Sequence, residues 1–342
     1  MDTQDSVMSF FQSWVKHFAP EYEKITVFCL YQGIVSLPKN VSVFSLSKEK
    51  YRNFLLRRIL YILRLLYLSF RYRKDYDIVF VHMNKEYVLV SGLLWKLLGK
   101  PICLWYNHYA GSFLTDIAAF LCNKIFYTSK FSYTAKYPQS VQMSVGVDTT
   151  KFVLNNSVQR KSPSLLFLGR ISPSKRLDIF INAFVSISQQ DKYKCIASVY
   201  GPTMAADKEY LNKWKSVIDK NNLSNKLTFH DGISTAETPS VYASHNIFIN
   251  CSKSGMYDKT LFEAAASGCI VITSSQDFRI LAGDEHYFDI SQPDELTHKI
   301  IPFLKISNDD LELIRIKMRR IADAHSLSAL SKQIHSHLEF IL

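Results

Sequence analysis

Two segments in the second half of the chain combine residue types that could bind a phosphorylated substrate. The first, residues 169–176 (GRISPSKR), follows a short apolar run and precedes a helical pattern. Gly169 lets the backbone turn sharply, while Arg170 and Lys175 offer a guanidinium fork and an ammonium that suit phosphate oxygens. Taken alone, this pattern is also typical of a solvated basic turn.

The second segment, residues 252–268, leads from a polar loop that contains Gly255 into a helix predicted to begin near Lys259 or Thr260. Backbone N–H groups and the positive end of the helix dipole at such a terminus favour a diphosphate. Glu263 is expected in the first turn of this helix, where its carboxylate could accept hydrogen bonds from vicinal hydroxyls such as those of a ribose. The alternative is an ordinary helix start whose charge complements the dipole.

The first half of the chain offers three polar residues that lie at or after the ends of predicted strands. His108 comes after an apolar run and before a Gly-Ser turn, where a catalytic or sugar-binding group would lie. His82 and Asn84 stand at the end of another apolar run. A lone histidine is more often structural, so a packing role is the alternative for both histidines.

The elements that must position these residues form two runs of alternating strands and helices. The first run predicts strands at Ile25–Leu30, Asp77–His82, Ile102–Tyr106 and Lys124–Thr128, and helices at 5–18, 50–73, 86–98 and 112–121. The second predicts strands at 165–168, 194–200, 227–230, 247–250 and 269–273, and helices at 177–189, 208–221, 237–243, 260–267, 293–304 and 308–341. Such alternation is typical of parallel sheets covered by helices. Ligands of these sheets bind beyond the carboxyl ends of the strands, so the default site is a cleft between the two units.

Composition excludes several classes of protein. The 342 residues carry a formal net charge of +11 at pH 7, but the basic excess is concentrated in one stretch of the first half, which argues against a nucleic-acid-binding protein. The six cysteines are scattered without a C-x-x-C pair, so we expect reduced core residues and neither a zinc site nor disulfides. Arginines interrupt the longest apolar stretch, Leu55–Phe70, which argues against a transmembrane helix.

The basic stretch itself, Lys48–Lys74, holds nine basic side chains against the single acid Glu49, interleaved with leucine, isoleucine and tyrosine. This combination on a helix is typical of an interfacial element attracted to anionic lipid. The alternative is that the apolar stripe packs on the sheet and the arginines are solvated.

Taken together and in this order, the segments resemble those of glycosyltransferase family 4, a retaining group with the GT-B architecture. The resemblance is most specific in LLFLGRISPSKRLDIFINAF (165–184), VGVDTTKF (145–152) and YASHNIFINCSKSGMYDKTLFEAAASGCIVI (242–272). It implies an α/β fold of two Rossmann-like domains that face each other across a cleft. It also implies that a nucleotide-sugar is the substrate and that no metal or other cofactor is bound.

The resemblance also implies roles for single residues. Arg170 and Lys175 match the basic pair that neutralises the donor diphosphate, and Glu263 matches the second glutamate of the E-x7-E motif, which binds the ribose. Gly201 falls where the nucleobase pocket is built, and His108 resembles a residue near the transferred sugar. The implied donor site comprises Gly169, Arg170, Lys175, Gly201, Gly255, Asp258, Lys259, Thr260, Leu261 and Glu263, the catalytic set is His108, Arg170 and Lys175, and the acceptor side has His82, Asn84 and His108.

The chain departs from the family pattern at two places. Gly255 stands where the first glutamate of E-x7-E would lie, with Asp258 and Ser254 as candidate substitutes, so the donor sugar and full catalytic competence are open. The usual opening hydrophobic strand is also missing, because residues 1–5 run directly into a helical pattern. We therefore expect that the true start lies upstream of Met1.

The sequence thus predicts an acceptor-side domain over residues 1–155, a donor-binding domain over 156–325, and a terminal helix at 326–342 that packs back on the first domain. The expected function is transfer of a sugar from a UDP- or GDP-sugar to a glycan or lipid-linked acceptor, in bacterial cell-surface polysaccharide or glycolipid synthesis. The alternatives are a GT-B nucleotide-sugar epimerase and a catalytically impaired binding or scaffold protein. We expect a cytoplasmic protein that associates with the inner face of the cell membrane.

Overall fold

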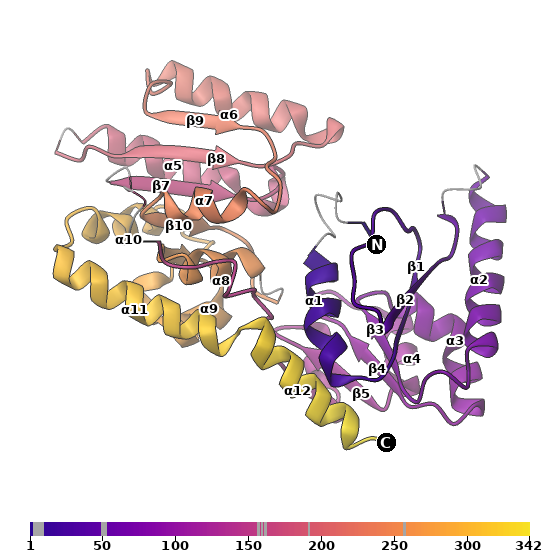
Figure 1. Cartoon of the computed structure of the whole chain (residues 1–342). Coiled ribbons are helices and arrows are strands. Elements are labelled where there is room, and N and C mark those ends of the chain that lie inside the picture. The colour runs from indigo at the N-terminus through magenta and orange to yellow at the C-terminus, as the bar shows by residue number, and fades with distance from the viewer. Residues whose placement is uncertain are drawn as a thin grey trace. The chain divides into compact units, whose positions relative to one another are not determined.

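The structure is a computed structural model that describes residues 1–2, 10–48, 53–155, 158, 160, 163–190, 192–255 and 258–342. The chain divides into two compact units (Figure 1). Unit 1 comprises Met1–Gly146 and Leu327–Leu342, and unit 2 comprises Val147–Ser326. The division after Gly146 therefore lies nine residues before the boundary that the sequence predicts after residue 155.

The described residues of unit 1 form two separate parallel sheets. In one, β1 (Ile25–Cys29) pairs with β2 (Val41–Ser45), and in the other the order is β3 (Val79–His82), β4 (Ile102–Trp105), β5 (Lys124–Tyr127) and β6 (Ser140–Gln142). Among the described residues, no strand is hydrogen-bonded to both β1 and β3. The strands predicted from the sequence do not include β2 or β6. Residues 3–9, the start of the helix predicted at 5–18, lie outside the described residues.

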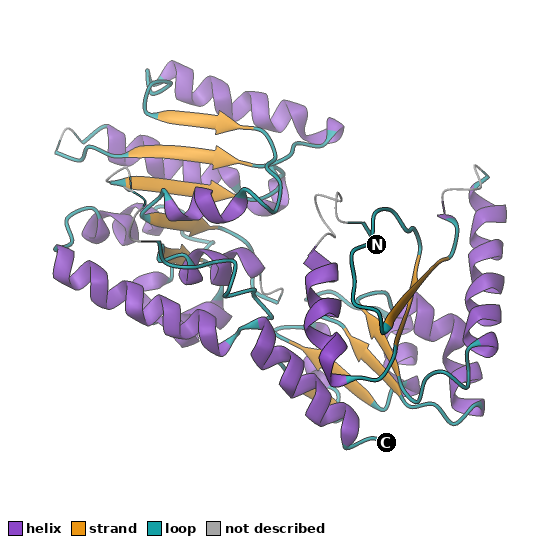
Figure 2. Ribbon diagram, in the orientation of Figure 1, coloured by secondary structure: helices purple, strands orange, loops and turns teal. Residues whose placement is uncertain are grey.

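Helices cover both faces of these strands (Figure 2). They are α1 (Phe10–Phe18), α2 (Phe54–Arg71), α3 (Lys85–Leu97), α4 (Phe113–Leu121) and α12 (Leu327–Glu339). α12 returns the end of the chain to unit 1, where the Ser331 hydroxyl donates to the His17 carbonyl (3.1 Å) and Gln333 accepts from the Ser144 N–H (3.0 Å). The buried rings of Trp14 and Trp105 meet edge to face in this core.

Unit 2 has one parallel sheet in the order β11 (Ile270–Thr273), β10 (Ile247–Asn250), β7 (Ser164–Leu168), β8 (Ile196–Tyr200) and β9 (Leu227–His230). The chain builds outward from β7 through β8 to β9 and then crosses to β10 on the other side of β7. The strand order therefore reverses between β7 and β10, and such a switch point is where open parallel sheets bind ligands.

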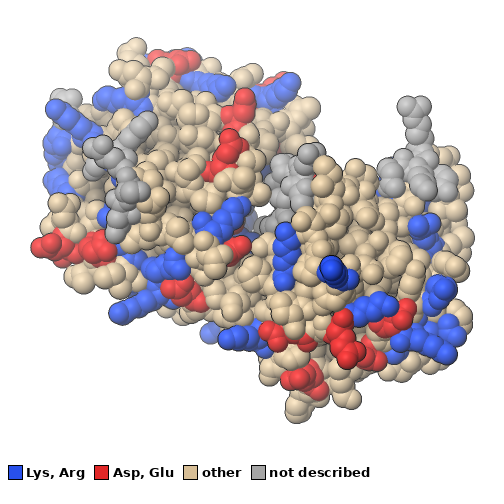
Figure 3. Space-filling model, in the orientation of Figure 1, with Lys and Arg blue, Asp and Glu red and all other residues tan. Residues whose placement is uncertain are grey.

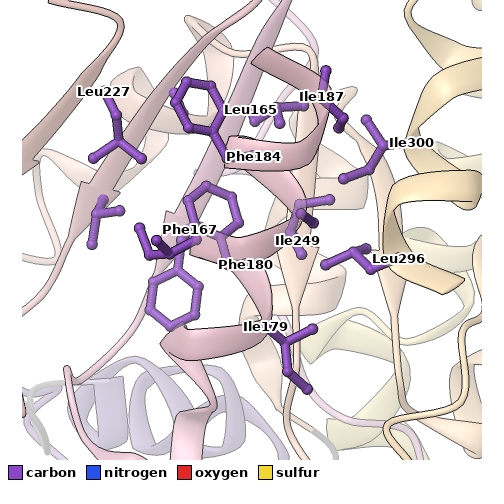
Figure 4. Close-up of a cluster of buried hydrophobic side chains, with 14 of the residues drawn as sticks. Leu165, Phe167, Ile179, Phe180, Phe184, Ile187, Leu227, Ile249, Leu296 and Ile300 are labelled. Atoms are coloured by element: carbon purple, nitrogen blue, oxygen red, sulfur yellow. The ribbon is translucent and has the colours of Figure 1, made fainter. Parts of the chain in front are cut away.

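The helices of unit 2 bury an apolar core against this sheet (Figure 4). Phe180 and Phe184 of α5 project onto Leu165 and Phe167 of β7 and are almost fully buried. The helices are α5 (Leu177–Ser188), α6 (Lys208–Lys220), α7 (Thr238–Ala243), α8 (Lys259–Ala266), α9 (Gln276–Ala282), α10 (Glu295–Phe303) and α11 (Asn308–Ala324). Short 3₁₀ helices lie at Ala19–Glu21, Tyr133–Lys136, Pro173–Lys175, Ala205–Asp207 and Asp284–His286. The single helix predicted over 308–341 is wrong, because the chain breaks between α11 and α12 at residues 325–326.

Within the described part of the chain, each helix is too short or too polar to cross a lipid bilayer.

Candidate functional site

The candidate site of unit 2 lies where β7 and β10 end, at the switch point of the sheet. Lys175 closes the 3₁₀ helix Pro173–Lys175 that follows β7, while Asp258 is the N-cap of α8, which follows β10. The Lys175 Nζ atom lies 2.5 Å from Asp258 Oδ2 and 3.1 Å from Ser252 Oγ. Two loops that are far apart in the sequence thus meet through one ion pair.

Asn250, the last residue of β10, completes this cluster. Its Nδ2 atom donates to Asp258 Oδ2 at 3.2 Å, and its Oδ1 atom accepts from the backbone N–H of Ser252 at 3.0 Å. The Ser252 hydroxyl lies 3.5 Å from the same Asp258 oxygen, and the backbone N–H of Thr260 donates to Asp258 Oδ1 at 3.3 Å. The carboxylate of Asp258 is therefore surrounded by donors.

The pKa of Asp258 reflects these donors. Burial acts to raise the pKa, but the Lys175 ammonium and the hydrogen bonds from Lys175 and Thr260 outweigh burial and lower it to about 2. Asp258 is consequently ionised at neutral pH, and the cluster holds a partly buried anion beside the start of a helix.

Glu263 and Lys259 lie one turn apart on α8. The Tyr242 hydroxyl, which is fully buried, donates to Glu263 Oε2 at 3.2 Å. Burial raises the pKa of Glu263 and lowers the pKa of Lys259, while the opposite charge of each residue partly offsets the effect on the other. A carboxylate whose pKa is perturbed in this way, on the same helix as the Asp258 cluster, is a candidate functional group.

One detail of the predicted helix start is wrong. α8 begins at Lys259, so Glu263 is its fifth residue and lies in the second turn, and no acidic residue lies in the first turn. Glu263 therefore does not complement the helix dipole at its terminus, and Asp258 takes that place as the N-cap. Gly255, with φ of +96°, precedes residues 256–257, which lie outside the described residues.

Of the other predicted donor residues, Gly169, Arg170 and Gly201 lie at the carboxyl ends of the neighbouring strands β7 and β8. Arg170 follows β7, is exposed, and has no hydrogen-bond or ion-pair partner among the described residues. Gly201 follows β8 and lies so close to the β7 loop that an added Cβ would meet the carbonyl oxygen of Gly169 at 1.9 Å. Only glycine fits there. The adjacent rings of Tyr200 and His230 stack with centroids 4.0 Å apart. Leu261 is buried in α8.

The three predicted acceptor-side residues lie in unit 1, at the ends of the paired strands β3 and β4. His82 ends β3, and its ring packs against the rings of Phe11 (4.9 Å) and Trp14 (5.2 Å), which shows a packing contact for this histidine. The half-buried His108 accepts from the backbone N–H of Ala110 through Nδ1 (2.9 Å) and stacks on a neighbouring tyrosine. Asn84 is the N-cap residue of α3. Their roles toward an acceptor stay predictions.

Sequence reasoning missed Asn250, Ser252 and Tyr242 as members of the site. Asn250 carried a usable signal, because it is a polar residue at the end of an otherwise apolar strand. Tyr242 lies 21 residues before Glu263, and nothing in the spacing shows that α7 brings its hydroxyl to that carboxylate. Among the residues that the structure describes, no group of three His, Cys, Asp or Glu side chains could hold a metal ion.

Comparison with known proteins gives a family match within unit 2 and structures of similar fold. Residues 150–317, which include the whole cluster, match the family model Glycosyl transferases group 1. A search of curated protein sequences finds no match. Solved structures of similar fold include HepE of Anabaena in complex with UDP and glucose (TM-score 0.77, 15% identity, covering 99% of this chain and 98% of HepE).

Two further structures extend the similarity over nearly the whole chain. Sucrose-phosphate synthase of Thermosynechococcus elongatus has a TM-score of 0.79 at 12% identity, and the match covers 97% of this chain and 92% of the synthase chain. A glycosyltransferase of Rickettsia africae has a TM-score of 0.77 at 16% identity, and the match covers 98% of this chain and 96% of the Rickettsia chain. At these identities the likeness shows the fold, which is that of the GT-B enzymes as the sequence predicts. The chain therefore has the GT-B fold, and the match of residues 150–317 to the glycosyl transferases group 1 model shows a transferase.

Proposed function

We propose that this protein is a retaining glycosyltransferase that uses a UDP-sugar or GDP-sugar as its donor. It transfers the sugar to a hydroxyl of a glycan or lipid-linked acceptor, in the synthesis of bacterial cell-surface polysaccharide or glycolipid. The observation that carries the proposal is the placement of Lys175, the start of α8 and Glu263 together at the switch point of the unit 2 sheet. The complex of HepE with UDP and glucose supports UDP as the first nucleotide to test.

The chemistry follows from the charges at this site. The bond between the sugar anomeric carbon and the diphosphate oxygen breaks, and its electron pair leaves with the diphosphate. The acceptor oxygen bonds to the carbon, and the proton of the acceptor hydroxyl passes to an oxygen of the departing diphosphate. Lys175 and Arg170 would neutralise the charge that develops on the diphosphate, and Glu263 would accept hydrogen bonds from the ribose hydroxyls. These groups supply charge neutralisation from the chain itself.

Titration calorimetry with UDP, GDP and ADP is expected to show binding of UDP or GDP to the full chain. Micromolar to millimolar affinity is the expected range for a substrate-derived product. In a second assay, UDP-sugars or GDP-sugars with acceptor lipid extract should release the free nucleotide. Absence of binding by all three nucleotides would overturn the proposal.

A second candidate function is nucleotide binding without catalysis. Gly255 favours it, because no carboxylate stands at the position where the family pattern has its first glutamate. Nucleotide binding without nucleotide release from any donor and acceptor pair would favour this candidate, whereas interconversion of the donor sugar without an acceptor would indicate an epimerase.

The membrane part of the proposal rests on α2. Leu55, Ile59, Leu63, Tyr67 and Phe70 recur three or four residues apart, so they share one face of the helix, and each is about half or more exposed. The opposite face is buried on the protein through Leu65 and Leu68. The apolar residues of α2 are therefore divided between two faces, and the larger part faces outward instead of packing on the sheet.

Arginines border this outward apolar face. Arg57, Arg64 and Arg71 recur every seven residues along one flank, and Arg58 lies on the other. In Figure 3, blue side chains stand beside tan surface on the α2 side of unit 1. Residues 49–52 of the predicted basic stretch lie outside the described residues. An exposed apolar face flanked by arginine fits an anionic bilayer surface.

Replacing Ile59 and Leu63 together with serine is expected to weaken binding to vesicles that contain anionic lipid by about tenfold, because each apolar side chain contributes to insertion. Co-sedimentation with phosphatidylglycerol-containing and purely zwitterionic vesicles measures this. The matched control replaces Leu313 and Ile316, two exposed residues of α11 in unit 2, with serine. Equal binding of the wild type to both kinds of vesicle would contradict the proposal.

A further inference from the structure

The carboxylate of Asp258 accepts hydrogen bonds from the same kinds of groups that bind phosphate. Oδ2 is 2.5 Å from Lys175 Nζ, 3.2 Å from Asn250 Nδ2 and 3.5 Å from Ser252 Oγ, and Oδ1 accepts from the Thr260 N–H at 3.3 Å. An ammonium, an amide, a hydroxyl and a backbone N–H at a helix start form an anion site. In this structure the anion is a side chain of the chain itself.

We propose that Asp258 is an internal anion that occupies a phosphate position of the donor site, and that a donor diphosphate displaces it and takes over Asn250 and Ser252 as ligands. This inference rests on the proposed function, because it concerns the same site. It assigns two ligands, Asn250 and Ser252, that are not among the donor-site residues predicted from the sequence.

The charges give the reason for displacement. With Asp258 in place, the charge of Lys175 is neutralised, and a diphosphate that approached this cluster would meet a like-charged carboxylate. A diphosphate oxygen at the position of Asp258 Oδ2 would instead satisfy the same donors and pair with the ammonium. The side chain of Asp258 is 18% exposed, so it borders solvent and can rotate toward it when it is displaced.

The opposite role for Asp258 makes a different prediction. If the carboxylate stayed in place and only oriented Lys175 for the diphosphate, loss of its charge would disorder the ammonium and weaken anion binding. A variant that removes the charge but keeps the shape and the helix cap separates the two roles. Asn is as good an N-cap as Asp, so Asp258→Asn is that variant.

The experiment measures binding of inorganic pyrophosphate and of UDP to the wild type and to Asp258→Asn by titration calorimetry. The variant is expected to bind pyrophosphate on the order of tenfold more tightly than the wild type, because a competing negative charge is removed. Equal or weaker pyrophosphate binding by Asp258→Asn overturns the inference. Asp294→Asn, which removes an exposed carboxylate just before α10, is the matched control and should leave pyrophosphate binding unchanged.

The pyrophosphate titration tests the inference, and the nucleotide titration tests the proposed function. A gain in pyrophosphate affinity without any UDP or GDP binding supports the displaced anion and contradicts the nucleotide-sugar donor. Ser252→Ala in the Asp258→Asn background should weaken pyrophosphate binding about threefold or more if the hydroxyl is a ligand. Unchanged affinity in that double variant removes Ser252 from the site. Thermal melting of each variant checks that the fold is kept.

Discussion

Replacing Lys175 with alanine is expected to lower kcat/KM for the nucleotide-sugar donor by on the order of 10²-fold or more. The ammonium stands beside the start of α8, where the departing diphosphate would gain negative charge as its bond to the sugar breaks. An interaction that strengthens as charge develops lowers the barrier to reaction. Nucleotide release at varied donor concentration measures kcat and KM, and near wild-type kcat/KM would remove Lys175 from the catalytic assignment.

The same substitution is expected to affect folding, and this effect must be separated from catalysis. Without Lys175, Asp258 keeps its other hydrogen bonds but loses its ion-pair partner. This loss is expected to lower the free energy of unfolding by about 1–2 kcal/mol at a partly exposed site. The double variant Lys175→Ala with Asp258→Asn should recover the thermal stability but not the activity. Lys226→Ala, at an exposed position just before β9, is the matched control and should change neither.

How far the sequence predicts this site depends on the range of the interaction involved. Lys175 and Glu263 could be found because their types, their order and their positions after apolar runs are local properties. The pairing of Lys175 with Asp258 joins residues 83 positions apart and depends on how two loops fold onto one sheet edge. The same holds for the hydroxyl of Tyr242, so the candidate donor residues are predictable but their hydrogen-bond network is not.

The smaller elements of the fold are likewise hard to predict from the sequence. Strands such as Ile102–Trp105 are apolar throughout and stand out, because both of their faces are buried in a parallel sheet. β2 (Val41–Ser45) mixes two serines with three apolar residues and is only half-buried, and β6 is three residues long, so neither produces such a run. The break between α11 and α12 falls at His325 and Ser326, where no glycine or proline marks the end of a helix.

Replacing Glu263 with glutamine is expected to weaken UDP binding by about 10- to 100-fold, because a charged acceptor for two ribose hydroxyls becomes a neutral one. Glutamine keeps the shape of the side chain and an oxygen that can accept from the Tyr242 hydroxyl. Titration with UDP and with 2′,3′-dideoxy-UDP measures the role of the ribose. The wild type should prefer UDP strongly, whereas Glu263→Gln should bind both ligands with similar affinity.

Two controls decide whether Glu263 acts on the ribose or through the structure of α8. Binding of pyrophosphate, which has no ribose, should be the same for Glu263→Gln and the wild type, and a parallel loss would show that the variant disturbs the start of α8 instead.

The second control is the pH dependence of UDP binding. Because burial raises the pKa of Glu263, its carboxylate takes up a proton at a higher pH than an exposed glutamate, and the protonated form resembles glutamine. The ratio of wild-type to variant UDP affinity, in which titration of the UDP phosphate cancels, should therefore fall toward one as the pH falls through this raised pKa, and a ratio independent of pH would contradict the assignment.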